Sequence, residues 1–298
     1  MRDTPYYTDL GAFSADFPEY ACAHRIPPTS LPFRIPKSLA SRFPENGNPV
    51  LGQFIPSGHE SKILPCESGD PLGERGHEVL PFLVHQYPSR VLIRTTDQCA
   101  AYCRFCFRRN LQTNGRGYLT KSHIDSICAY LQSHQPIREI LVSGGDPLFA
   151  SDSKIIELIG SLRKVAPDSV IRLCTRMPII MPERISEHFL QQLQQFNPVV
   201  FVIHTNHELE LDQETRKAFR QISLHGFRMF SQTVLLKGLN DDTKTLSSLF
   251  ASLFTLGVNP YYLFQGDLAA GTAHFRVPLS RGLSIYRELR RTLSGMEL

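Results

Sequence analysis

The chain has 298 residues, which is enough for one α/β barrel or two modest domains around a sizeable core. Hydrophobic residues make up 42% and charged residues 20%, proportions that exclude a disordered chain. The net charge of +4 without a long basic run gives no case for a nucleic-acid partner, and no apolar stretch is long enough to predict a membrane partner.

Residues 1–85 are predicted to form an irregular N-terminal extension with a few short helices. This part is rich in proline, as in Leu31-Pro32-Phe33 and Ile35-Pro36, and shows little periodicity. We expect residues 86–298 to form the second and larger domain.

From residue 90 onward, short β-branched or apolar runs alternate with segments of helical period. The runs predict six strands, at Arg90–Thr96, Glu139–Ser143, Val170–Thr175, Val199–His204, Met229–Leu236 and Pro260–Phe264. Helical faces include Ile124, Ile127 and Leu131, and Gly226 and Gly257 stand where helices should end. This alternation predicts an α/β fold, a partial (β/α)6 TIM-type barrel with right-handed crossovers. A doubly wound open sheet is the alternative.

Three of the seven cysteines crowd into the loop after the first predicted strand, in the pattern C-x3-C-x2-C formed by Cys99, Cys103 and Cys106. An odd number of cysteines with such a cluster is typical of a metal or redox site in a reducing compartment, so we expect a cytoplasmic protein. Three thiolates are one short of the four that a closed zinc site or an ordinary ferredoxin cluster requires.

The vacant fourth position suggests a 4Fe-4S cluster with one free iron. The amino and carboxylate groups of S-adenosylmethionine can chelate that iron, and an electron from the cluster can then cleave the sulfonium to methionine and a 5′-deoxyadenosyl radical. Two alternatives stay open: a zinc site completed by a distant histidine such as His85 or His123, and three buried thiols without metal.

Further motifs accompany the cysteines: Tyr87-Pro88-Ser89-Arg90, Cys106-Phe107-Arg108-Arg109, Ser143-Gly144-Gly145-Asp146, His204 with Asn206-His207, Gln232-Thr233-Val234-Leu235, Pro260-Tyr261-Tyr262, Gly266-Asp267 and His274-Phe275-Arg276. With these residues the chain resembles the radical S-adenosylmethionine superfamily, and more narrowly the lysine 2,3-aminomutase family. Within that family it is most similar to the branch that makes (R)-β-lysine for attachment to elongation factor P. We expect the motifs to lie at the carboxyl ends of strands, where the active site of a parallel α/β barrel is found.

The resemblance implies a set of S-adenosylmethionine contacts. Ser143, Gly144, Gly145 and Asp146 would hold the amino group, and His204 and Gln232 are implied as further contacts. A tight strand-to-helix turn would explain the two glycines equally well. His204 and Gln232 could instead be hydrogen-bonded core residues.

The resemblance also implies a small-molecule substrate, L-lysine or a related amino acid, and conversion of L-lysine to β-lysine. Arg108 would bind the substrate carboxylate as a bidentate partner, and Asp267 would bind the distal ammonium. Tyr87 and Arg90 would hold the phosphate of pyridoxal phosphate, and a donor such as flavodoxin or ferredoxin would reduce the cluster. An arginine beside the cysteines could instead be solvated surface.

The family's Schiff-base lysine lies in a segment beyond the final helix, and this chain ends near where that segment would begin. Lys237 and Lys244 do not match its position. We therefore expect weak, reversible binding of pyridoxal phosphate, with cluster formation and S-adenosylmethionine cleavage but little aminomutase turnover. Two readings compete: a radical S-adenosylmethionine protein without pyridoxal phosphate that acts on another substrate, and a non-catalytic zinc-binding module.

Overall fold

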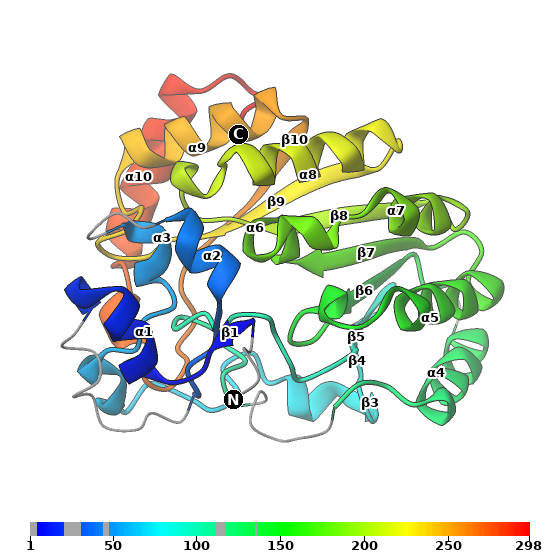
Figure 1. The fold of residues 1–298 in the computed structure, drawn as a ribbon. Coiled ribbons are helices and arrows are strands. Elements are labelled where there is room, and N and C mark those ends of the chain that lie inside the picture. Colours follow the sequence, from blue (N-terminus) through cyan, green and yellow to red (C-terminus); the bar gives the residue numbers. More distant parts are fainter. Residues whose placement is uncertain (1–4, 21–30, 44–47, 111–116, 135) are drawn as a thin grey trace.

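An open eight-stranded sheet forms the centre of the computed structural model, which describes residues 5–20, 31–43, 48–110, 117–134 and 136–298 (Figure 1). Its strands are β3 (Glu78–Leu80), β4 (Leu83–Tyr87), β5 (Arg90–Arg94), β6 (Glu139–Ser143), β7 (Val170–Thr175), β8 (Val199–His204), β9 (Arg228–Val234) and β10 (Val258–Phe264). Strands β5 to β10 are parallel and follow one another in chain order, whereas β3 and β4 add an antiparallel edge beside β5. All six predicted strands are confirmed, with ends that differ by at most two residues.

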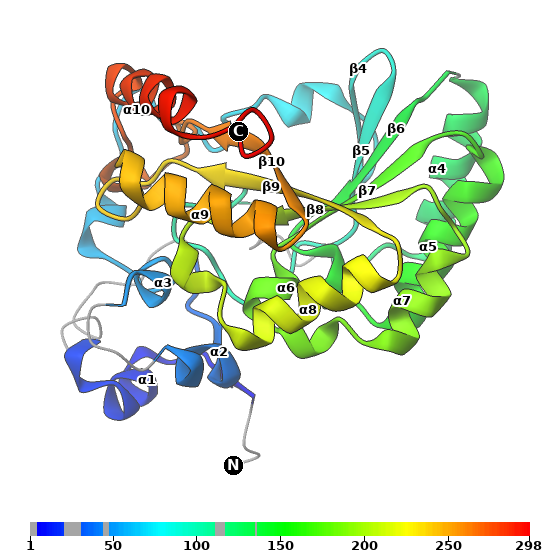
Figure 2. The same cartoon turned by 90° about the horizontal axis from the view of Figure 1, so that it is seen from above.

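The consecutive strand order decides between the two predicted architectures. A doubly wound sheet reverses direction at a switch point, and β5 to β10 do not reverse. Right-handed crossovers that all advance in one direction put their helices on one face of the sheet. Figure 2 shows these helices following one another around that face, which confirms a partial TIM-type barrel and makes the doubly wound alternative wrong.

The helices that cover the sheet carry the predicted apolar faces. They are α4 (Lys121–Ser133), α5 (Asp152–Val165), α6 (Met177–Ile180), α7 (Glu187–Gln194), α8 (Gln213–Leu224), α9 (Thr243–Thr255) and α10 (Leu279–Thr292), with 3-10 turns η4 (Pro147–Phe149), η5 (Pro182–Arg184), η6 (Glu208–Glu210) and η7 (Ala273–Phe275). Gly226 and Gly257 follow α8 and α9 with φ of 75° each, as predicted for helix ends. Among the described residues, no helix is long and apolar enough to cross a membrane.

The two faces of the parallel sheet differ in burial. Residues that point toward the helices, such as Val91, Ile93, Ile171 and Leu173, are at most 1% exposed. The alternate residues on the inner face are mostly half-buried, as the burial patterns of β6, β7 and β9 show. The inner face of the open barrel is therefore less buried than the face that the helices cover.

The N-terminal extension is more regular than predicted. It contains β1 (Tyr6–Tyr7) paired with β2 (Ile35–Pro36), helices α1 (Leu10–Asp16), α2 (Lys37–Arg42) and α3 (Pro49–Gly52), and the turns η2 (Gly58–Ser61) and η3 (Glu74–His77). Strands β3 and β4 were not predicted, because a short hairpin at a sheet edge has too few alternating residues to show a period. The boundary predicted at residue 85 falls inside β4.

Candidate functional site

The cysteine loop, residues 95–110, leaves the carboxyl end of β5. Within it, Cys99, Cys103 and Cys106 are half-buried. Burial raises the pKa of Cys106 to about 11 and raises that of Cys99 well above its ordinary value, and the charge of Cys103 contributes to both shifts. A thiol binds a metal as the thiolate, and a cationic centre between the cysteines would favour that form. The donor set therefore fits an iron–sulfur cluster.

The histidines of the zinc alternative are engaged elsewhere. His85 on β4 lies 2.7 Å from the hydroxyl of Tyr130, and His123 forms a capping box with Thr120 at the start of α4. Across the described part of the chain, no three His, Cys, Asp or Glu side chains are arranged to hold a single metal ion.

The N-terminal extension holds the cysteine loop by backbone and side-chain hydrogen bonds. The Arg34 guanidinium donates to the Cys99 carbonyl at 3.2 Å, and the Tyr102 N–H donates to the Arg34 carbonyl at 3.1 Å. The Arg104 N–H donates to the Gln53 carbonyl at 2.8 Å. The extension is thus part of the frame that positions the cysteines.

Glu60 on η2 joins the extension to the loop through two buried arginines. Its carboxylate accepts from Arg104 Nε at 2.9 Å and from Arg109 Nη2 at 2.5 Å. Burial alone would raise the pKa of Glu60, but the two guanidiniums hold it below its ordinary value of 4.5. The carboxylate is therefore ionised at neutral pH and compensates buried positive charge.

We expect Glu60→Gln to lower the free energy of unfolding by about 3 kcal/mol at pH 7, because it leaves two buried guanidiniums without their anion. A group with a depressed pKa stabilises above its ordinary pKa, so the difference should shrink as pH falls below 4.5. Urea unfolding at pH 7 and pH 3.5 measures both effects. The control is Glu214→Gln, which breaks an exposed ion pair with Lys217 and should cost less than about 1 kcal/mol. A Glu60 variant as stable as this control would contradict the assignment.

The turn after β6 packs directly on the start of the cysteine loop. The Gly145 N–H donates to the Thr96 carbonyl at 2.6 Å, and the Asp146 N–H donates to the Gln98 carbonyl at 2.9 Å. A Cβ on Gly144 would lie 2.5 Å from the Thr96 oxygen, and one on Gly145 would lie 2.1 Å from the Gln98 oxygen. The glycines are therefore explained by close backbone packing, and their contact with a ligand stays a prediction.

Asp146 uses its carboxylate inside the protein. It accepts from the Thr175 hydroxyl at 2.7 Å, from the Arg176 N–H at 2.7 Å and from the Leu148 N–H at 3.0 Å. Burial raises its pKa to about 6, against these hydrogen bonds, so the group is still mainly ionised at pH 7. The carboxylate ties the turn after β6 to the end of β7, and its contact with an ammonium group stays a prediction.

His204 and Gln232 are neighbours, because they pair in register at the ends of β8 and β9. The Asn206 amide oxygen accepts from the Val234 N–H at 2.9 Å, so it must also accept from His204 Nε2 at 3.1 Å. Burial, together with the positive charge of Arg176, lowers the pKa of His204 to about 3. The imidazole is therefore neutral and keeps Nδ1 as a hydrogen-bond acceptor.

Arg108 and Asp267 lie near each other, and Glu74, which was not predicted, lies with them. The Arg108 guanidinium binds both carboxylate oxygens of Glu74 on η3, and its Nη1 donates to the Ser143 hydroxyl at 3.2 Å. Burial raises the pKa of Asp267, while the nearby charge of Arg108 lowers it. A positive and two negative groups thus lie beside the cysteine loop.

Tyr87 and Arg90 do not lie at the carboxyl end of a parallel strand, so the expected placement is wrong for this pair. They face each other across the β4–β5 hairpin, with the guanidinium 4.0 Å from the ring centroid, at the amino end of β5. Thr95 lies five residues further along, about 16 Å away in an extended strand. A ligand that reached both ends would have to run along the inner face.

Sequence reasoning missed Arg176 and Glu74. Arg176 follows β7 directly, and its Nη1 donates to Cys103 Sγ at 2.9 Å. The signal was available, because Arg176 stands after a correctly predicted strand, as the other motifs do. Glu74 lies in a segment without periodicity, where nothing in the sequence indicates a contact with Arg108.

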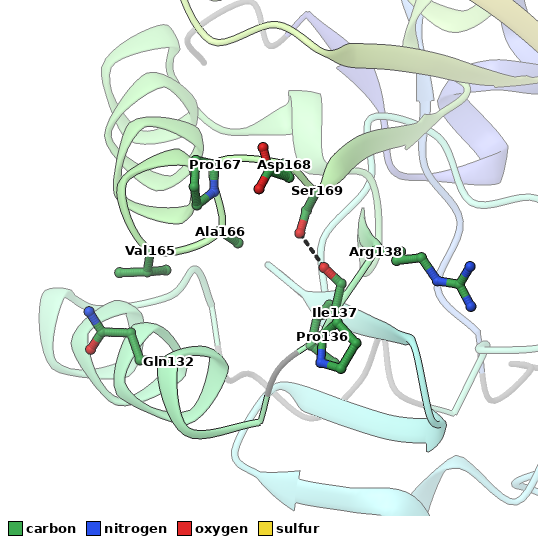
Figure 3. A pocket seen from close by; sticks show the side chains of 9 residues that line it. All are labelled: Gln132, Pro136, Ile137, Arg138, Val165, Ala166, Pro167, Asp168 and Ser169. Carbon is green, nitrogen blue, oxygen red and sulfur yellow. Dashed lines mark hydrogen bonds between the residues drawn. The ribbon is translucent and has the colours of Figure 1, made fainter.

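A surface pocket of about 380 Å³ lies away from this site (Figure 3). It is lined by the segments that lead into β6 and β7, and the Ser169 hydroxyl donates to the Ile137 carbonyl at its edge. Since these segments precede their strands, the pocket is at the opposite end of the sheet from the cysteine loop.

Comparisons with known proteins identify related sequences. Residues 89–223 match the family described as a 4Fe-4S single cluster domain. The chain is 37% identical to the L-lysine 2,3-aminomutase of Acetoanaerobium sticklandii over 252 residues, which cover 84% of this chain and 61% of that protein. It is 35% identical to the L-lysine 2,3-aminomutase of Escherichia coli over 295 residues, which cover 96% of this chain and 84% of that protein.

Solved structures with a similar fold have low sequence identity. Streptococcus suis SuiB bound to its precursor peptide SuiA aligns with a TM-score of 0.54 at 12% identity, over 73% of this chain and 48% of that chain. Native anSMEcpe with bound AdoMet aligns with a TM-score of 0.51 at 12% identity, over 67% and 59% of the two chains. These likenesses concern the fold alone.

Proposed function

The chain belongs to the lysine 2,3-aminomutase family of radical S-adenosylmethionine enzymes, and from this premise we propose that it converts L-lysine to β-lysine. One observation carries the proposal: the cysteine loop includes Arg108, and Glu74 and Asp267 lie beside that residue at the carboxyl end of an open parallel sheet. This arrangement offers a place for a radical initiator next to groups that suit both ends of a diamino acid.

We propose that Cys99, Cys103 and Cys106 bind three irons of a 4Fe-4S cluster. When bound, the cluster and S-adenosylmethionine supply the electron and the carbon radical that start the reaction. The turn at Ser143–Asp146 fixes the loop that carries the cysteines, and neutral His204 with Gln232 presents hydrogen-bonding groups to the nucleoside.

In the proposed substrate site, Arg108 binds the carboxylate and Asp267 binds the distal ammonium. Glu74 occupies the Nε–Nη2 edge of the Arg108 guanidinium, whereas Nη1 donates to the Ser143 hydroxyl. The Nη1 side is therefore the one we assign to the substrate. Glu74 holds the guanidinium in a fixed orientation, which lowers the cost of ordering it when lysine binds.

Pyridoxal phosphate is the second cofactor that we propose, and it would supply an imine that delocalises the unpaired electron. Arg90, which is stacked on Tyr87 at the amino end of β5, would meet its phosphate, and the cofactor would then extend along the inner face toward the cysteine loop. A one-electron donor such as flavodoxin or ferredoxin would reduce the cluster. A cytoplasmic location and delivery of β-lysine to elongation factor P complete the proposal.

We expect Asp267→Asn to raise the KM for L-lysine more than tenfold, because the amide loses a charge-assisted hydrogen bond worth about 1.5–3 kcal/mol. Lysine-independent formation of 5′-deoxyadenosine should not change. Steady-state kinetics of both reactions measures this split. The matched control, Asp125→Asn on the exposed face of α4, should leave both unchanged. An unaltered KM in the Asp267 variant would remove Asp267 from the substrate site.

The function itself is tested by anaerobic reconstitution with iron and sulfide, followed by incubation with dithionite, S-adenosylmethionine and L-lysine. Parallel reactions contain or omit pyridoxal phosphate, and mass spectrometry identifies the products. We expect β-lysine only when pyridoxal phosphate is present, and in smaller amounts than 5′-deoxyadenosine, because a weakly bound cofactor leaves much of the cleavage uncoupled. Formation of 5′-deoxyadenosine with no β-lysine at any concentration of pyridoxal phosphate would instead favour a radical enzyme with another substrate.

A further inference from the structure

A buried guanidinium contacts one of the three cysteines. Arg176 is 6% exposed, and its Nη1 donates to Cys103 Sγ at 2.9 Å. The rings of Phe54 and Phe105 lie 4.9 and 5.5 Å from its central carbon, so the charge is buried and flanked by two aromatic rings. In such surroundings a full positive charge acts strongly on a neighbouring sulfur.

The position of Arg176 is fixed from several sides. Its backbone N–H donates to Asp146, and its Nη2 donates to Glu210 Oε1 at 2.7 Å and to Gln53 Oε1 at 2.6 Å. Glu210 is fully buried and also accepts from the Thr205 hydroxyl at 2.7 Å. The guanidinium cannot turn away from Cys103 without breaking these bonds.

We propose that Arg176 is a positioning residue that sets the reduction potential of the cluster held by the cysteine loop, with Glu210 as its opposing charge. Reduction takes one electron from the external donor and adds one negative charge to the cluster and its thiolates. The Arg176 charge and its hydrogen bond to a ligand sulfur stabilise that reduced state and so raise the potential. The Glu210 carboxylate binds Arg176 Nη2, and its negative charge lowers the reduction potential of the cluster.

Because Arg176 and Glu210 carry opposite charges, their removal should shift the reduction potential in opposite directions. A loss of packing would not produce this difference in sign. Arg176→Gln should make the one-electron reduction equilibrium at least tenfold less favourable, a shift of about 59 mV to lower potential. Glu210→Gln should move the potential upward. Arg176→Lys, which keeps the charge, should lie nearer to the unsubstituted protein than Arg176→Gln.

The experiment is a redox titration of the full-length reconstituted protein, followed by the EPR signal of the reduced cluster and referred to iron and sulfide content. Arg163→Gln is the control, because it removes the same charge far from the cysteine loop. Arg163 donates to the Phe196 carbonyl near the amino ends of the strands. Its potential should not change.

This role of Arg176 and Glu210 rests on the proposed cluster, but the experiment distinguishes a failure of the proposed function from a failure of this role. An unsubstituted protein that binds no iron contradicts the proposed function and this inference with it. A normal cluster whose potential is the same in the Arg176→Gln and Glu210→Gln variants, or moves the same way in both, contradicts this inference alone. If the Arg176→Gln protein does not assemble a cluster, the reduction potential of the Glu210→Gln protein is the deciding measurement. A Glu210→Gln potential that does not move upward overturns the proposal.

Discussion

Replacing Cys103 with alanine should leave the reconstituted protein without a cluster and without 5′-deoxyadenosine formation. The same result is expected for Cys99 and Cys106, because each of the three thiolates binds one iron of the proposed cluster and the loop has no replacement for it. Iron and sulfide analysis together with the visible absorption spectrum measures the first effect. Chromatography of the nucleoside products measures the second.

Cys128→Ala is the matched control, because this thiol lies on α4 and packs against the outer core. It should keep the full iron content, as should Cys174→Ala. Full iron loading in the Cys103→Ala protein would overturn the assignment of the three ligands.

Gly145→Ala should be nearly as damaging, although it removes no ligand. A Cβ at this position would lie 2.1 Å from the carbonyl oxygen and 2.6 Å from the carbonyl carbon of Gln98, which directly precedes Cys99. Both atoms belong to the backbone, so relief requires the cysteine loop to move. We expect a loss of about 3 kcal/mol in unfolding free energy, and little or no cluster.

Gly58→Ala tests whether the effect is specific. A Cβ on Gly58 meets nothing within 4 Å, so stability and iron content should stay the same. Thermal unfolding and iron analysis of the two variants make the comparison. A Gly145→Ala protein that binds iron normally would show that the contact between the two loops does not position Cys99.

The parallel sheet could be predicted from the sequence because each strand is a short apolar run bounded by turn residues. The runs at Glu139–Ser143, Val170–Thr175 and Val199–His204 coincide with β6, β7 and β8. The carboxyl ends of these strands also indicated most of the candidate site, since parallel strands deliver their following loops to one edge.

The contacts that organise the site could not be predicted, because they join residues far apart in the chain. Glu74 reaches Arg108 across 34 positions, and Gln53 reaches Arg176 across 123. Both come from the proline-rich extension, where no period marks a face that will be buried. The sequence therefore predicts only an irregular extension, whereas Glu60, Gln53 and Glu74 join it by hydrogen bonds to the cysteine loop and its neighbours.

The nucleoside that the reduced protein forms is the most direct test of a cluster held by Cys99, Cys103 and Cys106. Protein reconstituted anaerobically with iron and sulfide should be brown, and with dithionite and S-adenosylmethionine it should yield 5′-deoxyadenosine and methionine in equal amounts. The Cys103→Ala variant should yield neither. A colourless protein that retains zinc, takes up no iron and leaves S-adenosylmethionine intact would contradict the central claim.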